Sequence, residues 1–232
     1  MKMQYPKANK YMVPRYLRKI MGPNPLKLLE EILARYPLAP GSRVMDLGCG
    51  QGLTSLFLHK EYDLQVTACD LWIDPTDNLT FFREENADIL PLRTDATEKL
   101  PFARESFDAI VSIDSYHYFG REKGFLEERI LPFVKKGGWV LLAVPGMKTD
   151  LHHDLPPCML LSWTPEDLAT IRSAAFWQQL LPNAQVFEME GNEELWQDWL
   201  RQENPYAMGD RKAMNAGAGQ YMNFVGIAIQ KS

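Results

Sequence analysis

The sequence predicts one α/β domain, with a mainly parallel, doubly wound sheet and helices on both of its faces. Three observations support this prediction. A buried strand pattern at residues 43–47 runs into a turn with three glycines and then into a helical segment. A second strand pattern at residues 64–70 ends in an acid, 20 positions after the middle glycine. The 232 residues are enough for one domain with a substantial core.

Proline and glycine delimit the first elements. Residues 26–36 are a predicted helix, because apolar residues recur at helical spacing after Pro25 and because Pro37 ends the segment. The strand at 43–47 then begins, and a helix at 53–60 follows the glycine turn. This order predicts a helix, a strand and a second helix before the next strand.

Strand and helix patterns continue to alternate as far as residue 144. The predicted strands are residues 64–70, 89–93, 106–114 and 139–144. The predicted helices between them are residues 78–86 and 122–134, and Gly137 and Gly138 follow as the stop of the second one. Because such alternation is typical of βαβ units, we expect these strands to be parallel.

The last third of the chain is less regular. Residues 145–163 form a long connection, and loops of this length are usually functional or mobile, so we expect a substrate-facing cover loop. The remaining predicted elements are a helix at 168–181 that starts near Ser162 or Thr164, a strand at 184–190, a helix at 193–202 and a strand at 221–230. Residues 215–219 are glycine-rich, but no helix follows them, so they are a turn.

Composition excludes several classes of protein. Hydrophobic residues make up 46% and charged residues 24%, as in an ordinary globular protein. The formal net charge of −5 argues against a general nucleic-acid binder. No long apolar run or signal-type start is present, so we expect a cytoplasmic protein without a membrane partner. The three cysteines, Cys49, Cys69 and Cys158, lack metal-site spacing, so we expect reduced thiols.

The glycine turn predicts a small-molecule cradle. Glycine allows positive φ and a close backbone approach, and the following helix N-terminus points N–H groups at the ligand. The glycines are Gly48, Gly50 and Gly52, one residue tighter than the Gly-x-Gly-x-x-Gly dinucleotide pattern. Asp46 lies where the strand runs into the turn, and its carboxylate suits a cationic ligand better than a pyrophosphate.

These residues resemble the class I S-adenosylmethionine-dependent methyltransferases, in particular their small-molecule branch. The resemblance covers about residues 26–144 and is most specific at residues 44–52, with Asp70 as the acid of the second strand. It implies a Rossmann-like, seven-stranded sheet whose last strand is antiparallel. It also implies S-adenosylmethionine as the cofactor and methyl transfer by in-line displacement.

The resemblance assigns cofactor contacts by position. Asp70 would accept from the ribose hydroxyls, Asp95 from the adenine amino group, and the Ala96 N–H would reach a ring nitrogen. Trp72 would either stack on the cofactor or cap the core. The residues expected to contact the cofactor are Asp46, Gly48, Cys49, Gly50, Gly52, Asp70, Leu71, Asp95, Ala96, Asp114 and Tyr11.

Residues 1–25 carry many basic side chains between tyrosines, before the first acid. One interpretation is a solvated basic arm that leans on an acidic body. The other, which the resemblance favours, is a lid over the cofactor, and Tyr11 belongs to that lid. An anionic substrate would benefit from its charge.

The acceptor side is predicted at the end of the fourth strand, since ligands lie beyond the carboxyl ends of parallel strands. His117 is the candidate general base for an oxygen acceptor, although a structural histidine is the commoner finding. Tyr116 and Tyr118 would orient the acceptor. His152 and His153 have no further ligand at recognisable spacing, so no metal site is predicted.

Three functions follow as hypotheses. The favoured one is a methyltransferase that acts on a small molecule. Relatives that methylate DNA amines carry a motif with two prolines at this point, and residues 114–117 of this chain lack both prolines. A methyltransferase acting on RNA or protein would need a large basic face. A non-catalytic cofactor-binding domain would keep the cradle without an open pocket beside His117. The oligomeric state does not follow from the sequence.

Overall fold

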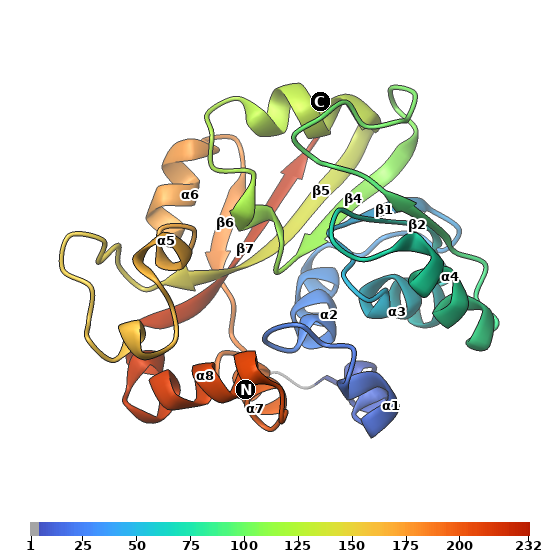
Figure 1. The fold of residues 1–232 in the computed structure, drawn as a ribbon. Helices are drawn as coiled ribbons and strands as arrows, with labels where there is room; N and C mark the ends of the chain where they lie inside the picture. The colour runs from blue at the N-terminus through green and yellow to red at the C-terminus, as the bar shows by residue number, and fades with distance from the viewer. Residues whose placement is uncertain (1–4) are drawn as a thin grey trace.

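The computed structural model describes residues 5–232, and its centre is one seven-stranded sheet (Figure 1). The strand order is β3-β2-β1-β4-β5-β7-β6. Neighbours from β3 to β5 are parallel, and β7 is antiparallel to both β5 and β6. This confirms the predicted Rossmann-like fold with its antiparallel last strand.

The strands and helices have the following bounds. The strands are β1 (Arg43–Leu47), β2 (Gln65–Asp70), β3 (Leu90–Arg93), β4 (Phe107–Ile113), β5 (Val134–Met147), β6 (Gln185–Glu188) and β7 (Met222–Gln230). The α-helices are α1 (Pro14–Leu17), α2 (Pro25–Arg35), α3 (Leu53–Tyr62), α4 (Pro75–Glu84), α5 (Pro165–Leu168), α6 (Ala174–Leu180), α7 (Glu193–Leu200) and α8 (Pro205–Asn215). The short turns are η1 (Ala8–Tyr11), η2 (Tyr116–Tyr118), η3 (Leu126–Ile130), η4 (Leu131–Phe133), η5 (Met159–Leu161) and η6 (Ala218–Gln220).

Each face of the sheet has its own hydrophobic core. Side chains alternate between the faces along a strand, so the neighbours Val44 and Met45 on β1 are both fully buried, but in different cores. The first core includes residues of α2, α3 and α7, and the second includes Trp177 of α6. Because both faces of β1 are covered, its carboxyl end is a rigid support for the turn that follows.

The predicted helix at 122–134 is wrong. A single π-helical turn, η3, and a 3-10 turn, η4, occupy this segment. Pro132 has no N–H to donate, so an α-helix does not continue through it. The structure also corrects the start of β5, which begins at Val134 and passes through Gly137 and Gly138. Gly137 has φ of 76°, and the β4–β5 register shifts nearby, so the glycines are an irregularity within a strand.

The C-terminal third also differs from the prediction. The helix expected at 168–181 is two helices, because Ser173 caps a new helix at α6. Helix α8 was not predicted, although Asn204 caps it and Pro205 opens it. The cover loop expected from residue 145 begins only after Met147, where β5 ends.

The N-terminal segment lies against the body of the protein from Tyr5 onward. Lys10 forms an ion pair with Glu61 at 2.7 Å, and Arg15 forms one with Glu85 at 2.6 Å. Tyr5 is itself buried. These contacts agree with a basic arm that leans on an acidic body; residues 1–4 of that predicted arm lie outside the described residues. In residues 5–232 no helix is long and apolar enough to cross a membrane.

Candidate functional site

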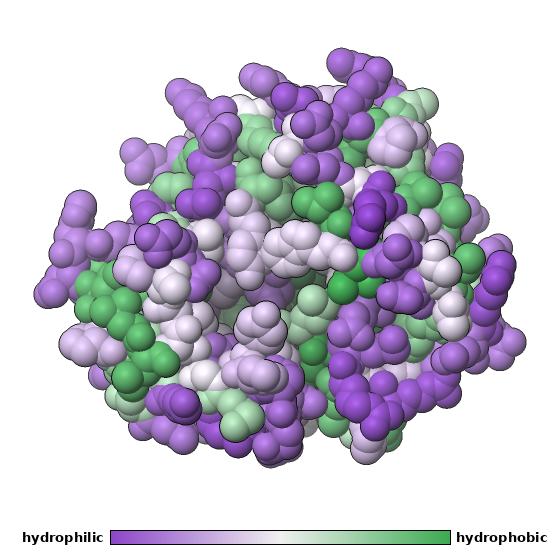
Figure 2. All heavy atoms as spheres, viewed as in Figure 1, coloured by the Kyte–Doolittle hydropathy of each residue, from purple (hydrophilic) through white to green (hydrophobic). Residues whose placement is uncertain are grey.

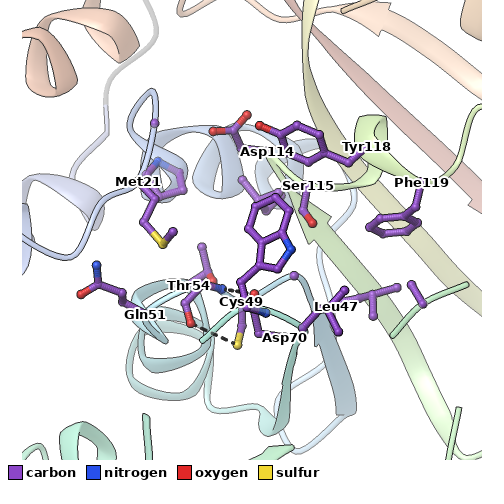
Figure 3. A pocket seen from close by; sticks show the side chains of 18 of the residues that line it. Met21, Leu47, Cys49, Gln51, Thr54, Asp70, Asp114, Ser115, Tyr118 and Phe119 are labelled. Carbon is purple, nitrogen blue, oxygen red and sulfur yellow. Dashed lines mark hydrogen bonds between the residues drawn. The ribbon is translucent and has the colours of Figure 1, made fainter. Parts of the chain in front are cut away.

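A cavity of about 300 Å³ opens beyond the carboxyl ends of the parallel strands (Figure 3). Its walls come from the turn after β1, from the ends of β2 and β4, from the turn after β3, and from the N-terminal segment. The volume is at the lower end of the range of small-molecule sites. The cavity therefore lies where ligands bind in open α/β sheets.

Glycine is required in the turn after β1. Gly48 has φ of 80° and Gly50 has φ of 52°, both in the left-handed region. A Cβ on Gly48 would overlap the hydroxyl of Ser115, and a Cβ on Gly50 would lie 3.1 Å from the Met21 sulfur. Gly52, with φ of 79°, caps α3 outside the cavity, and a Cβ there would meet the Phe82 ring at 2.7 Å.

Asp70 is held by backbone N–H groups at the end of β2. Its Oδ2 accepts from Gly50 N at 2.8 Å, and its Oδ1 accepts from Trp72 N at 2.8 Å and Ile73 N at 2.9 Å. A carboxylate offers about four acceptor positions, so roughly one is left, on Oδ2. Asp70 lines the cavity but is only 8% exposed, so the turn and the strand end are fixed together before any ligand binds.

Asp46 lies beneath the turn and does not line the cavity. The hydroxyls of Thr54 and Ser55 each donate to its Oδ2 at 2.6 Å, which ties β1 to the first turn of α3. Burial raises the pKa of Asp46 to about 6, against the effect of these two donors. Its Oδ1 is buried and has no hydrogen-bond partner in the described structure.

Asp95 and Ala96 line the cavity in the turn after β3. The Thr97 N–H and hydroxyl donate to Asp95 Oδ1 at 2.8 and 2.7 Å. These hydrogen bonds hold the pKa of Asp95 below its usual value. The turn is therefore preformed and presents a carboxylate beside the buried Ala96.

Asp114 follows β4 and differs from the other carboxylates. It has φ of 54°, an unusual conformation for a residue other than glycine. Gly22 covers it so closely that a Cβ on Gly22 would overlap Asp114 Oδ2. Burial, followed by the negative charge of Asp210, raises the pKa of Asp114 to about 8. No side chain or N–H in residues 5–232 donates to its carboxylate.

Besides Asp46 and Gly52, three more residues expected at the site lie outside the cavity lining. The Tyr11 hydroxyl donates to Glu61 at 3.2 Å, away from the glycine turn. Tyr116 is fully buried in the core against Trp177, with ring centroids 5.8 Å apart. His117 is 2% exposed, and burial lowers its pKa to about 3, so it is poorly suited to be a base.

Several residues that sequence reasoning missed line the cavity. Lys19, Met21 and Gly22 reach it from the N-terminal segment, and Ser115 and Phe119 reach it from the end of β4. Position after a strand could have identified Ser115. The N-terminal residues belong to the segment 1–25 that the resemblance offered as a lid, but no local pattern singled out these three, because tertiary packing brings them to the turn.

The aromatic residues at the rim are exposed. Trp72 is 66% exposed and Tyr118 49%, and their rings meet edge to face with centroids 5.5 Å apart. Trp72 therefore does not cap the core. Both residues line the cavity, with Leu71 between Asp70 and Trp72.

The cysteines and histidines do not form a second centre in the described part of the chain. Cys49 lines the cavity and Cys69 is buried nearby, and burial raises the pKa of both thiols, that of Cys69 to about 12. Such thiols are poor nucleophiles. His152 Nε2 lies 3.0 Å from the Leu168 carbonyl, and within residues 5–232 no three His, Cys, Asp or Glu residues gather as metal ligands.

Comparison with known proteins identifies the fold family. A model of the methyltransferase domain matches residues 44–138. The glycine/sarcosine/dimethylglycine N-methyltransferase of Actinopolyspora halophila is 28% identical over 121 residues, which is 51% of this chain and 21% of that protein. The fatty-acid O-methyltransferase of Mycolicibacterium smegmatis is 31% identical over 104 residues, 44% of this chain and 36% of that protein. The matched part of the chain thus spans 21% and 36% of the length of these two curated relatives.

The fold similarity extends further than the sequence similarity. The structure of phosphoethanolamine N-methyltransferase 2 of Haemonchus contortus in complex with S-adenosyl-L-methionine superposes with a TM-score of 0.73 at 18% identity. This match covers 98% of the present chain and 57% of that chain. Residues 44–138 are thus similar in sequence to the methyltransferase domain, and the chain has the Rossmann-like fold of these methyltransferase structures along nearly its whole length.

Proposed function

We propose that the protein transfers a methyl group from S-adenosylmethionine to a small-molecule acceptor. The observation that carries this proposal is the glycine turn joined to Asp70, whose carboxylate is fixed by three backbone N–H groups at the cavity wall. The match of this segment to the methyltransferase domain supports the same reading of the turn.

The residues present fit the proposed methyl donor. The absence of side chains at Gly48 and Gly50 leaves a cradle that a Cβ would fill. Three carboxylates and one ammonium group line the cavity, namely Asp70, Asp95, Asp114 and Lys19. This balance favours a ligand with positive charge over a pyrophosphate. When bound, S-adenosylmethionine supplies a methyl carbon that its sulfonium activates for in-line displacement.

The chain's own residues would hold the ligand at three points. Asp70 Oδ2 would accept from a ribose hydroxyl, since one acceptor position remains there. Asp95 would accept from the adenine amino group through the oxygen that Thr97 does not occupy. The backbone of Gly48 and Gly50 would approach the remainder of the donor. Apolar Leu47 and Ile113 line the same cavity and would exclude water from the reacting atoms.

The acceptor side gives no support to His117 as the base. The histidine is buried behind Tyr118, with ring centroids 4.0 Å apart, and it does not line the cavity. The named relatives are an N-methyltransferase of glycine, sarcosine and dimethylglycine and an O-methyltransferase of fatty acids, which supports a small acceptor here. A cytoplasmic location and the absence of a nucleic-acid partner stay predictions.

Calorimetric titration with S-adenosylhomocysteine tests this function, and NAD serves as the comparison ligand. We expect saturable binding of S-adenosylhomocysteine in the micromolar range, about −8 kcal/mol, and no binding of NAD. Binding of NAD in preference would contradict the proposal and favour a dinucleotide enzyme.

A further inference from the structure

The unpartnered carboxylate of Asp114 is the feature of the cavity that the donor-binding residues leave unexplained. Asp70 and Asp95 each accept hydrogen bonds from neighbouring N–H groups, but Asp114 accepts none in the described chain. Asp114 is half-buried and lines the cavity, and its oxygens are not among the buried atoms that lack a partner. Its carboxylate is therefore open to a donor on a ligand in the cavity.

The protein leaves one side of the Asp114 carboxylate open to the cavity and covers the other. The backbone of Gly22 lies against Oδ2, and any larger residue at this position would overlap the carboxylate. Lys19 lines the same cavity but does not pair with Asp114; its Nζ lies 4.0 Å from the centre of the Phe81 ring. The one lysine of the lining thus leaves the carboxylate for a ligand.

The surroundings of Asp114 favour a cation. The Asp114 carboxylate and the Tyr118 ring lie together, across the cavity from Asp70 and Cys49 (Figure 3). Aromatic faces at the rim, Tyr118 and Trp72, stabilise cations at close range. Asp210 of α8 adds negative charge to this side, where Ser162 and Trp199 hold it at 2.7 and 2.8 Å.

From these observations we infer that Asp114 binds the ammonium group of the methyl acceptor, so that the acceptor is a small amine and the product its N-methylated form. The inference rests on the proposed function. An ammonium group has no lone pair, so one N–H proton must leave before nitrogen attacks. Asp114 takes this proton: the N–H bond breaks, an O–H bond forms, nitrogen keeps the electron pair, and both groups become neutral.

Burial supports this role for Asp114. It raises the pKa of the carboxyl to about 8, between that of an ordinary carboxyl and that of an alkylamine. A proton shared between such a carboxyl and an amine is transferred at little cost, because the best base has a pKa close to the working pH. Asp114 would then be a catalytic residue that touches the acceptor nitrogen.

The test uses the full chain saturated with S-adenosylhomocysteine and three probes of equal length: propylammonium, 1-propanol and propionate. Saturation-transfer NMR measures binding of each probe. We expect propylammonium to bind at least about tenfold more tightly than the other two, and Asp114→Asn to remove that preference. The matched control is Asp154→Asn, which changes an exposed aspartate of the 148–158 loop and should keep the preference.

Calorimetry on the same variants separates a failure of this inference from a failure of the proposed function. We expect Asp114→Asn to bind S-adenosylhomocysteine within about twofold of the wild type. A loss of more than tenfold would assign Asp114 to the donor's own ammonium group and overturn the inference. If Asp114→Asn does not fold, Asp114→Ser gives the same comparison. Failure of the wild type to bind S-adenosylhomocysteine contradicts the proposed function, whereas binding without a preference for propylammonium overturns only this inference.

Discussion

Two carboxylates on opposite sides of the cavity have different surroundings. Asp70 accepts three backbone hydrogen bonds of 2.8 to 2.9 Å, whereas Asp114 accepts none from the described residues. We call residues 48–52 with Asp70 and Asp95 the donor side, and Asp114 with Tyr118 the acceptor side. These two names rest on the function proposed above: the carboxylate of Asp70 is held by backbone N–H groups, whereas that of Asp114 stays open to a ligand.

The surface of the protein carries exposed apolar residues. Figure 2 shows pale and purple residues over much of the visible face, with green patches among them. Among the exposed apolar residues are Leu160 and Leu161 of η5 and Met208 of α8, which neighbours η5. η5 and α8 belong to the less regular C-terminal third of the chain, whereas regular βα units carry residues 48–52, Asp70 and Asp95.

The largest expected effect comes from the donor side, at Gly48. Gly48→Ala adds a Cβ that overlaps the Ser115 hydroxyl and must adopt φ of 80°. We expect the affinity for S-adenosylhomocysteine, measured by calorimetry, to fall about 100-fold or more, because the turn must move. Gly41→Ala is a matched control, since Gly41 has φ of 79° and open space around it.

The Gly41→Ala control separates the effect of backbone strain on affinity from the effect of a changed cavity shape. Gly41→Ala should cost about 1 kcal/mol of unfolding free energy and leave ligand affinity unchanged. Equal affinity losses in both variants would show that backbone strain, and not the shape of the cradle, explains the effect.

The second effect concerns Asp70. Asp70→Ala removes the ribose acceptor and leaves three N–H groups without their partner. We expect the affinity for S-adenosylhomocysteine to fall by about 1.5–3 kcal/mol, roughly ten- to a hundredfold. The control is Asp88→Ala, because Asp88 is exposed and precedes the neighbouring strand β3. Unchanged affinity in Asp70→Ala would remove Asp70 from the donor side.

A smaller effect is expected at Asp95. Asp95→Asn keeps an oxygen for Thr97 but places an amide N–H₂ where the adenine amino group would donate. We expect a loss of about 1 kcal/mol in the affinity for S-adenosylhomocysteine, and a smaller loss for an analogue without the amino group. The same loss for both ligands would contradict the adenine contact.

These expectations also indicate what the sequence could and could not predict. The geometry of the glycine turn was predictable because its signal lies in a short segment: the glycines need positive φ, and Asp70 ends the predicted second strand. His117 and Tyr116 were misplaced, because their position after a strand does not reveal which side of the turn each ring faces. Helix α8 and the Gly22 contact depend on packing between distant segments, which local patterns do not encode.

A further expected effect is on stability and concerns the acceptor side. The pKa of Asp114 is raised to about 8 in the folded state, above its usual 3.8. The folded protein thus keeps a proton that the unfolded chain releases, so this contribution to stability is complete below about pH 4 and lost as the pH rises through 8. The negative charge of Asp210 acts on Asp114, and the charges of Asp114, Asp167 and Asp210 act on Tyr118.

We therefore expect Asp114→Asn to become more stable relative to the wild type as the pH rises from 6 to 9. The expected difference is at least about 1 kcal/mol, or about 2–4 °C in Tm for a chain of this size. Thermal unfolding of both proteins at the same pH values measures it, because other titrating groups cancel. Parallel curves would mean that Asp114 titrates at an ordinary pKa and is well solvated.

The most direct test of the central claim is a crystal structure of the protein with S-adenosylhomocysteine. We expect a ribose hydroxyl at about 2.7 Å from Asp70 Oδ2, the adenine beside Ala96, and the sulfur on the side of Asp114 and Tyr118. A ligand bound outside this cavity, or one whose ribose faces Asp114 in place of Asp70, would contradict it.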